Sequence, residues 1–432
     1  MKIYIQSRNF ISNNLDFIVN FNIMAAKIFI ILSLLITFFG NSNLPIRNSA
    51  PPKFLLGDEA FIGNNLDEVK DKKVGLITNQ TGILSNGSSI LDVLIQNGIN
   101  VVKIFSPEHG IRGDESYSDK DEKTGIPTVS LFGDKMAPSR ADLQDVDVMI
   151  YDIQDVGARF YTYTSSLYYC IESASANNKK IIIFDRPMII NPNYVDGFML
   201  DRNFESFVGK IPVPICYGMT CGELADYLQD YLSVNPELVE VSKMINYSRS
   251  IDYDQLNLTW VKPSPNIFTS ATAVAYPATC FLEGTNVSEG RGSDKPFEYF
   301  GAPWCNGDSL AKELSSYNFE GVVFEPITFT PNQKISAYPP KYFGEECPGV
   351  YIKATDKRKF EAAKIGVAIL ISLNKLFKEF KFNKDNYIDK LAGTDKLRKM
   401  VLGGTDLQSI VNSWKDELDT FKATREKYLL YR

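Results

Sequence analysis

Apolar and polar positions follow two different periods along the chain between residues 53 and 184. Short stretches that are apolar at nearly every position predict β-strands, whereas apolar residues three or four positions apart predict helices. The predicted strands cover residues 74–78, 101–105, 128–132, 147–153 and 180–184, and the predicted helices cover residues 88–96 and 160–177. Uniformly apolar strands separated by helices are typical of a parallel sheet that is covered on both faces. We therefore predict a Rossmann-like α/β fold for this part.

The pattern changes in the second half of the chain. Thr220 and Glu223 form a capping-box pattern before a predicted helix over 222–232. Residues 260–305 are rich in Pro, Gly, Ser and Thr and contain few periodic segments, and helical spacing returns at 357–376 and within 397–421. We predict two domains, a Rossmann-like catalytic domain over 53–250 and a smaller α+β domain over 251–432. The second domain is expected to contribute the 280–304 loop to the cleft.

The N-terminal residues 1–50 form a separate segment. Residues 28–39 (IFIILSLLITFF) are almost continuously apolar and follow Lys27, which is typical of the apolar region of a signal peptide. Met24 is an alternative true start. We predict an exported protein, periplasmic or extracellular, and the alternative is a segment that stays uncleaved as a membrane anchor.

Composition narrows the classes of partner and cofactor. The formal net charge of −6 argues against a nucleic-acid partner, and no pattern implies a stable protein partner. The six cysteines form no C-x-x-C pair, and a chain with one histidine offers no zinc-ligand pattern. We expect most of the cysteines to be buried thiols; only Cys216–Cys221 is considered as a disulfide. No metal or organic cofactor is expected.

Polar residues gather at the carboxyl ends of the predicted strands. In parallel α/β sheets, ligands bind in the crevice outside these ends, so four such clusters are expected to meet in one cleft. A single Asp after a strand is more simply explained as a helix cap, but four clusters together favour a site. The clusters are Asn79, Glu108 with His109, Asp152 with Gln154 and Asp155, and Asp185 with Arg186.

Several common active-site motifs are absent from the sequence. There is no G-x-G-x-x-G after the first strand, no G-x-x-x-x-G-K-[ST] and no G-x-S-x-G. The absences argue against a bound dinucleotide, a nucleoside triphosphate and a serine hydrolase of the usual kind. The remaining carboxylates, with one imidazole, suit acid/base chemistry on a neutral polar substrate such as a sugar.

Six long motifs resemble the NamZ-type exo-β-N-acetylmuramidases. They are GLITNQTG (75–82), FSPEHGIRGD (105–114), YDIQDVGARFYTYTSSL (151–167), YGMTCGELA (217–225), PSPNIFT (263–269) and CFLEGTNVSEGRGSDKPFEYFGAPW (280–304). The resemblance implies a glycoside hydrolase that releases terminal β-1,4-linked N-acetylmuramic acid from the non-reducing ends of peptidoglycan fragments. Residues 185–191 (DRPMIIN) depart from the DRPNP pattern followed by Gly-Gly that relatives show, in a loop that is expected to contact substrate.

The resemblance and the residue chemistry together suggest catalytic roles. Glu108 is expected to be the general acid, since burial beside apolar neighbours favours a protonated carboxyl. His109 is expected to orient Glu108 or to bind the sugar, and the alternative is a loop residue bonded to its own backbone. For the second role, Asp152 or Asp155 would orient the 2-acetamido group of the substrate, or Glu283 or Glu289 would act as nucleophile or base.

The remaining candidates are predicted to bind substrate. A cation is needed for the lactyl carboxylate of N-acetylmuramic acid, and Arg159 and Arg291 are preferred over Arg186 and Arg112. The aromatic run 160–163, which includes Tyr163, is expected to stack on sugar or to belong to a helix core. Other predicted contacts are Asn79, Gln154, Asp155, Asp185, Glu283 and Asn286. Two competing interpretations are an exported, non-catalytic muropeptide-binding protein and a metal-assisted hydrolase that uses His109.

Overall fold

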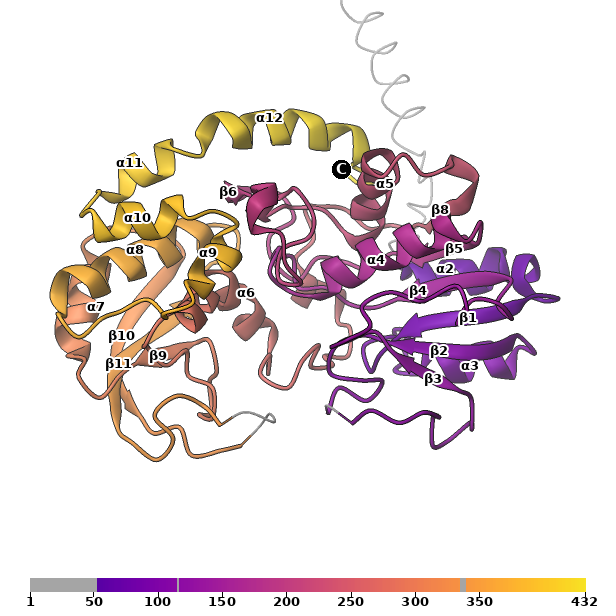
Figure 1. Ribbon diagram of the computed structural model, residues 1–432, viewed down its shortest axis with the longest axis horizontal. Helices are drawn as coiled ribbons and strands as arrows, with labels where there is room; N and C mark the ends of the chain where they lie inside the picture. The colour runs from indigo at the N-terminus through magenta and orange to yellow at the C-terminus, as the bar shows by residue number, and fades with distance from the viewer. Residues whose placement is uncertain (1–52, 115, 335–338) are drawn as a thin grey trace, which may run out of the picture. The chain divides into compact units, whose positions relative to one another are not determined.

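The first half of the chain forms a six-stranded parallel sheet in the order β3-β2-β1-β4-β5-β8 (Figure 1). This is the strand order of the Rossmann fold, so the predicted fold class is confirmed. The computed structural model describes residues 53–114, 116–334 and 339–432, and the predicted export segment lies outside them. The strands are β1 (Lys73–Thr78), β2 (Asn100–Ser106), β3 (Thr128–Ser130), β4 (Val148–Asp152), β5 (Lys180–Phe184) and β8 (Val239–Ser242).

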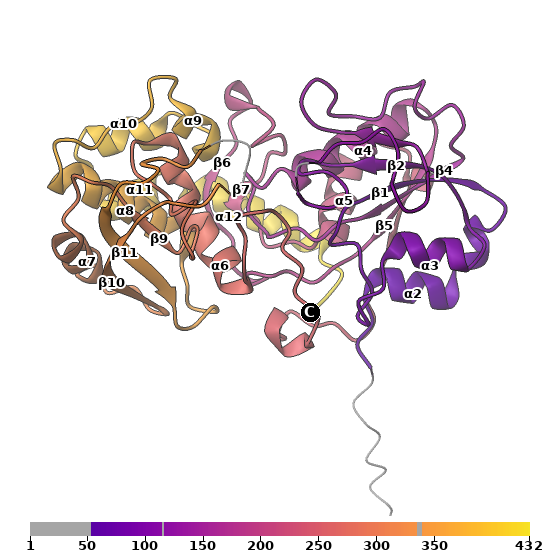
Figure 2. The same ribbon diagram turned by 90° about the horizontal axis from the view of Figure 1, so that it is seen from below.

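Both faces of the central strands β1, β4 and β5 are buried, as their nearly continuous apolar sequences predict. In β4, Val148 and Ile150 pack with residues of α2 and α3, whereas Met149 and Tyr151 pack with residues of α4 and α5. Figure 2 shows α2 and α3 together on one side of the sheet. The predicted strand over 180–184 is confirmed, but the sequence missed β8, whose VEVS sequence alternates polar and apolar residues. The helices are α2 (Gly57–Asn64), α3 (Ile90–Gln96), α4 (Tyr163–Ala176) and α5 (Cys221–Tyr231).

The capping box before α5 is confirmed. Thr220 Oγ1 accepts a hydrogen bond from Glu223 N at 3.2 Å, and Thr220 N donates to Glu223 Oε2 at 2.9 Å. These bonds satisfy backbone groups at the start of the helix that have no partner within it. The sequence therefore located this helix to within one residue of its observed start.

A second sheet and a group of helices form the other domain. The sheet is antiparallel, in the order β10-β11-β9, and a separate antiparallel pair joins β6 to β7. Residues 260–305 were expected to be largely irregular, but they contain α6, a helix that the sequence obscured because Pro277 lies inside it. The strands of the second sheet are β9 (Tyr299–Gly301), β10 (Val322–Phe329) and β11 (Cys347–Ala354), and the separate pair, β6 (Asp196–Met199) and β7 (Pro214–Cys216), lies within residues 53–250. The helices are α6 (Ser270–Thr279), α7 (Gly307–Ser315), α8 (Ala362–Leu376), α9 (Tyr387–Ala392), α10 (Lys396–Leu402), α11 (Leu407–Asn412) and α12 (Lys415–Arg425).

The apolar core continues from the parallel sheet into the second domain. Phe160, at the entry to α4, packs edge-on against Tyr276 of α6, with ring centroids 5.4 Å apart. Helix α8 lies close to α6 at Gly366, where a Cβ atom would come within 2.7 Å of the carbonyl oxygen of Ala278. The shared core fixes the loops of one domain against the helices of the other, which is what a site formed by both requires.

The C-terminal residues return to the first domain. After α12, which spans between the two groups of elements in Figure 1, Tyr431 donates its hydroxyl hydrogen to Asp185 Oδ2 at 2.6 Å. Arg425 Nη2 also donates to the carbonyl oxygen of Gly218 at 2.6 Å.

In the part of the chain that the structure describes, no helix is both long and apolar enough to cross a membrane.

All six cysteines are buried free thiols, so the disulfide considered for Cys216–Cys221 is not formed. Cys216 belongs to β7, whereas the Sγ atom of Cys221 lies 3.6 Å from the carbonyl oxygen of Phe184 at the end of β5. Burial raises the pKa of the Cys216 thiol above its ordinary value. The expectation that the cysteines are mostly buried apolar residues is confirmed.

Candidate active site

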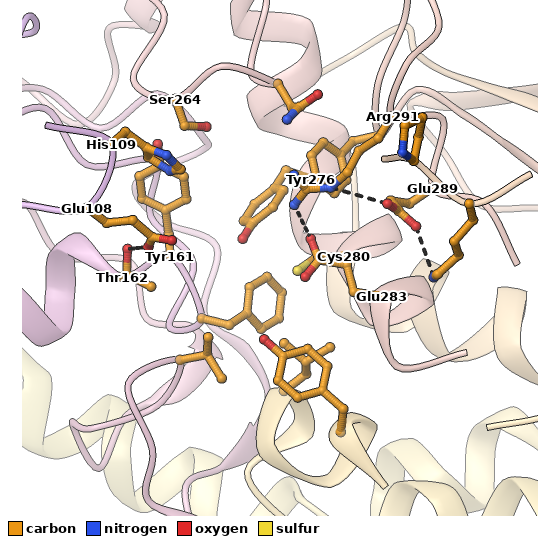
Figure 3. Close-up of a pocket in the computed structure, with 18 of the residues that line it drawn as sticks. Glu108, His109, Tyr161, Thr162, Ser264, Tyr276, Cys280, Glu283, Glu289 and Arg291 are labelled. Atoms are coloured by element: carbon orange, nitrogen blue, oxygen red, sulfur yellow. Dashed lines mark hydrogen bonds and ion pairs between the residues drawn. The ribbon is translucent and has the colours of Figure 1, made fainter. Parts of the chain in front are cut away.

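A pocket of about 540 Å³ lies where the loop after β2 meets the segment 280–297 of the second domain. Figure 3 shows Glu108, Tyr161 and Thr162 on one side of this pocket and Glu283 and Arg291 on the other. The lining combines carboxylates, two cations and several aromatic rings, a composition that suits a sugar. The lining residues are Glu108, His109, Tyr117, Phe132, Phe160, Tyr161, Thr162, Val208, Ser264, Asn266, Tyr276, Cys280, Glu283, Glu289, Arg291, Phe297, Pro339, Pro340, Lys341, Tyr387 and Leu391.

Glu108 is placed by the end of β2 and the start of α4. The strand ends at Ser106, and the Glu108 side chain then reaches the pocket, where it is half-buried. Its Oε2 atom accepts a hydrogen bond from Thr162 Oγ1 at 2.5 Å (Figure 3). Thr162 is the N-cap residue of α4, so the rigid start of a helix holds this carboxyl group. The burial expected for Glu108 is therefore partial.

The backbone after Glu108 adopts an uncommon conformation. His109 has a φ of 73°, in the left-handed region that residues other than glycine seldom adopt. Gly110 follows with a φ of 74°, and its N–H donates to the carbonyl oxygen of Pro107 at 3.1 Å. The His109 N–H donates to the hydroxyl of Tyr117 at 3.1 Å. Strained residues of this kind persist where the surroundings hold them, and they are concentrated at functional sites.

The facing wall is an ion-pair network centred on Arg291. Its Nη2 atom donates to Glu283 Oε1 at 2.6 Å, and its Nε atom lies 3.2 Å from Glu289 Oε1. Lys341 Nζ approaches the other oxygen of Glu289 at 3.1 Å. Burial alone would raise the pKa of Glu289, but Lys341 and Arg291 lower it below its ordinary value. Glu289 is therefore a charged group that holds two cations in place, and it is poorly suited to donate a proton.

Aromatic and amide side chains complete the pocket. Tyr161 lines it, and its ring packs edge-on against Tyr276, with centroids 5.7 Å apart. Tyr387 of α9 also lines the pocket, where burial, followed by the charge of Glu283, raises the pKa of its hydroxyl. Asn266 is 4% exposed, and its Oδ1 atom accepts no hydrogen bond from any residue that the structure describes. A buried acceptor that lines a pocket without a partner is suited to bind a ligand.

Five of the predicted site residues line the pocket: Glu108, His109, Glu283, Glu289 and Arg291. The sequence singled out no role for several other lining residues. Ser264 and Asn266 lie in the PSPNIFT motif, which was a usable signal, although no residue was chosen from it. Tyr276, Lys341 and Tyr387 come from segments that carried no local pattern.

The structure corrects the expected positions of Asp152 and Arg186. Arg186 Nε donates to Asp152 Oδ1 at 2.5 Å, and its Nη2 donates to Asp152 Oδ2 at 2.9 Å and to Asp58 Oδ2 at 3.0 Å. All three side chains are buried, and none lines the pocket. Since a buried charge requires a partner, this cluster is an internal ion pair beneath the ends of the strands.

The structure also corrects the position of Arg159, which is fully buried and does not reach the pocket. Its Nη1 atom donates to the carbonyl oxygens of Phe198 and Val213 at 2.7 and 2.8 Å, and its Nη2 donates to that of Leu391 at 3.0 Å. Burial lowers the pKa of Arg159 to about 9. This guanidinium therefore joins segments of the protein and is not presented to a substrate.

The other residues that were predicted to contact substrate form hydrogen bonds within the protein and lie outside the pocket lining. Each has at least one hydrogen-bond partner within the protein, although Arg112 is exposed and Asp155 Oδ1 has no partner among the described residues. Asn79 bonds to Tyr163 and Thr81, Arg112 to Asp121, and Gln154 to Pro187; Asp155 bonds to Tyr217 and Gly157, Tyr163 to Pro263, Asp185 to Thr220 and Tyr431, and Asn286 to Glu379 and Lys381.

Among the residues described, no group of three or more His, Cys, Asp and Glu side chains is arranged to hold a metal ion. Glycoside hydrolases act with a pair of carboxyl groups that flank the scissile bond, and this pocket has carboxylates on two facing walls. The fold and the pocket are thus those expected of a two-domain α/β glycoside hydrolase.

Comparison with known proteins identifies the family. Residues 74–271 match the N-terminal domain of the exo-β-N-acetylmuramidase NamZ, and residues 274–431 match its C-terminal domain. The chain belongs to the NamZ family. It is 39% identical over 392 residues, 89% of its length, to the peptidoglycan β-N-acetylmuramidase NamZ of Bacillus subtilis (strain 168), of which the match covers 93%. The sequence-based resemblance is confirmed, and the alternative of a non-catalytic binding protein is not favoured.

Two solved structures share the fold. Both are proteins of the DUF1343 family from Bacteroides fragilis NCTC 9343. One has a TM-score of 0.81 and 31% identity, and the other has a TM-score of 0.74 and 33% identity. Each match covers 88% of this chain and 99% of the solved chain.

Proposed function

We propose that this enzyme releases terminal β-1,4-linked N-acetylmuramic acid from the non-reducing ends of peptidoglycan fragments, with Glu108 as the general acid. The observation that carries the proposal is the asymmetry of the pocket. Glu108 is bonded to the neutral hydroxyl of Thr162, whereas Glu283 and Glu289 face it in contact with Arg291. Glycoside hydrolysis requires two carboxyl groups in different environments, one that donates a proton and one that stays charged.

Glu108 would protonate the oxygen that joins the terminal sugar to the rest of the chain. Its carboxyl group is half-buried and is fixed by Thr162, so it is positioned before substrate binds. The hydrogen bond from the His109 N–H to Tyr117 helps to hold the loop in its strained conformation. His109 would contact the substrate or orient Glu108 from the adjacent position.

Glu283 is the best candidate for the second carboxylate. Asp152 and Asp155 do not line the pocket, and Glu289 is held between two cations. The Glu283 side chain retains 21% exposure, and it contacts the guanidinium of Arg291 at the edge of the pocket. In this position it would stabilise the positive charge that develops at the anomeric carbon, as nucleophile or as base for water.

Arg291 would recognise the lactyl carboxylate that distinguishes N-acetylmuramic acid from N-acetylglucosamine. Its guanidinium is held from two sides by Glu283 and Glu289, and 32% of its side chain is exposed in the pocket. A guanidinium that is fixed in this way loses little freedom when it binds a carboxylate. Asn266 Oδ1 offers an acceptor for an N–H or hydroxyl group of the same sugar.

Export of the protein remains part of the proposal. The support is the apolar run at 28–39 that follows Lys27. Fractionation of cells that express the full chain, with N-terminal sequencing of the product, tests it. Recovery in the periplasm or the medium is expected, and an unprocessed protein in the cytoplasm would contradict it.

The activity is tested with the disaccharide MurNAc-GlcNAc and with longer chains that begin with MurNAc. Purified enzyme is expected to release free N-acetylmuramic acid one residue at a time, as measured by chromatography. Internal cleavage, or binding of the chains without release, would contradict the proposed exo-hydrolysis.

A further inference from the structure

Two exposed aromatic rings lie at the pocket. Tyr117 is 46% exposed and Phe132 is 39% exposed, and both belong to the pocket lining. Their rings are stacked, with centroids 6.3 Å apart and an interplanar angle of 13°. Large apolar side chains left exposed together at a pocket often mark a binding surface.

The two rings are fixed by three separate segments. The Tyr117 hydroxyl accepts a hydrogen bond from His109 N, so its ring is tied to the residue that follows Glu108. Phe132 comes two residues after β3, and its ring packs against Phe207 with centroids 5.8 Å apart. We call Tyr117, Phe132 and Phe207 the aromatic platform. Because its position is fixed before substrate arrives, little entropy is lost when a flat ligand stacks on it.

The platform lies on the side of the pocket that carries Glu108. The general acid must reach the oxygen between the terminal sugar and its leaving group. Under the proposed function, Arg291 on the facing wall binds the terminal N-acetylmuramic acid. The leaving group then extends from Glu108 away from Arg291, toward the residues that adjoin the acid. Tyr117 is directly connected to that loop through its bond to His109.

We propose that the aromatic platform binds the first sugar of the leaving group, an N-acetylglucosamine residue. One face of a β-linked pyranose presents C–H groups and little polarity, and the electron-rich face of an aromatic ring attracts such groups. This inference rests on the proposed function and adds to it a binding site for the part of the substrate that is not released as N-acetylmuramic acid. It implies a preference for substrates whose leaving group is a sugar.

The platform is tested by titration with GlcNAc-MurNAc, a disaccharide whose N-acetylglucosamine lies at the non-reducing end. It resembles the leaving chain and offers no terminal N-acetylmuramic acid to cut. Phe132→Ala is expected to weaken binding about five- to tenfold in an NMR titration, since one stacking contact is lost. Phe132→Trp, which keeps an aromatic face, is expected to bind the disaccharide as wild type does.

A matched control is available in the second domain. Tyr317 and Phe319 form another stacked pair, with centroids 5.9 Å apart, and neither residue lines the pocket. Phe319→Ala removes the same ring and is expected to leave the titration unchanged. Wild-type affinity in Phe132→Ala, or an equal loss in Phe319→Ala, would overturn the platform. Failure of the wild-type enzyme to release N-acetylmuramic acid would overturn the proposed function, while the titration still decides whether the platform binds sugar.

Discussion

Thr162 donates its hydroxyl hydrogen to Glu108 Oε2 at 2.5 Å, which joins the first turn of α4 to the loop that follows β2. The two residues are 54 positions apart in the sequence. The parallel sheet brings them together, because α4 follows β4, a strand near β2 in the sheet. The fold thus positions the carboxyl group that we assign as general acid.

Thr162→Val should reduce turnover without a large change in substrate affinity. Valine keeps the shape of threonine but cannot donate a hydrogen bond to Glu108. A hydrogen bond between neutral groups contributes about 0.5–1.5 kcal/mol, so kcat is expected to fall about two- to tenfold. Steady-state kinetics on MurNAc-GlcNAc measures this, and Thr162→Ser should restore most of the rate. An equal deficit in the serine variant would contradict the positioning role.

Arg291→Ala should remove discrimination between two kinds of substrate. Loss of a fixed guanidinium is expected to lower kcat/KM on muraminides about thirtyfold or more, with a much smaller effect on N-acetylglucosaminides. The comparison uses nitrophenyl glycosides of both sugars. Arg112→Ala is the matched control, because Arg112 pairs with Asp121 outside the pocket lining. Equal losses of kcat/KM on both sugars would show that Arg291 does not recognise the lactyl carboxylate.

Arg186→Met should destabilise the fold. Removal of one partner of a buried ion pair leaves Asp152 and Asp58 without compensation, at a cost of about 3–5 kcal/mol in the free energy of unfolding. Urea denaturation measures the change. Arg358→Met removes a more exposed ion pair with Asp252 and should cost less than about 1 kcal/mol. Unchanged stability, with a selective loss of substrate affinity, would instead place Arg186 in the binding site.

Asp155→Asn should change how stability depends on pH. Burial raises the pKa of Asp155 from 3.8 to about 6, although hydrogen bonds from Tyr217 and Gly157 act to lower it. The folded state therefore binds this proton more tightly than the unfolded state does. The stability that the carboxyl group contributes is fully present below about pH 4 and is lost as pH rises to about 6.

The difference in unfolding free energy between wild type and Asp155→Asn should accordingly fall between about pH 4 and pH 6.5. The expected change is up to about 3 kcal/mol, and the difference should be constant above that range. Urea denaturation of both proteins at several pH values measures it. A difference that does not vary with pH would show that Asp155 has an ordinary titration in the folded protein.

The sheet could be predicted from the sequence because its strands carry a strong local signal. Strands such as β4 and β5 are buried on both faces and are therefore apolar except for Asp152 at the end of β4 and Lys180 at the start of β5. The helix α6 was hidden by Pro277, and β8 by its polar residues. The hydrophobic pattern of the sequence predicts a strand or helix well where burial requires an apolar residue at nearly every position. It predicts an element poorly where that element is partly exposed.

The site could be predicted only in part. The rule that ligands bind beyond the ends of parallel strands placed four polar clusters in one cleft, but only Glu108 and His109 reach the pocket. The others, such as Asn79 and Arg186, bond to one another or to neighbouring segments, because buried polar groups must be satisfied. Residues such as Tyr387 are brought to the pocket by tertiary packing, and no local sequence pattern indicates such packing.

The assignment of Glu108 as the general acid is tested by the Glu108→Gln variant. Glutamine keeps the size of the side chain and can still accept the hydrogen bond from Thr162, but it cannot donate a proton as an acid does. The measurement compares release of N-acetylmuramic acid from MurNAc-GlcNAc and from the nitrophenyl glycoside, whose leaving group needs little protonation. Glu122→Gln, an exposed glutamate further along the same connection, is the matched control.

Glu108→Gln is expected to lose about 10³-fold in rate on the disaccharide and much less on the nitrophenyl glycoside, with an unchanged circular dichroism spectrum. Cleavage of MurNAc-GlcNAc by Glu108→Gln at a rate close to that of wild type would contradict the assignment of Glu108 as the general acid.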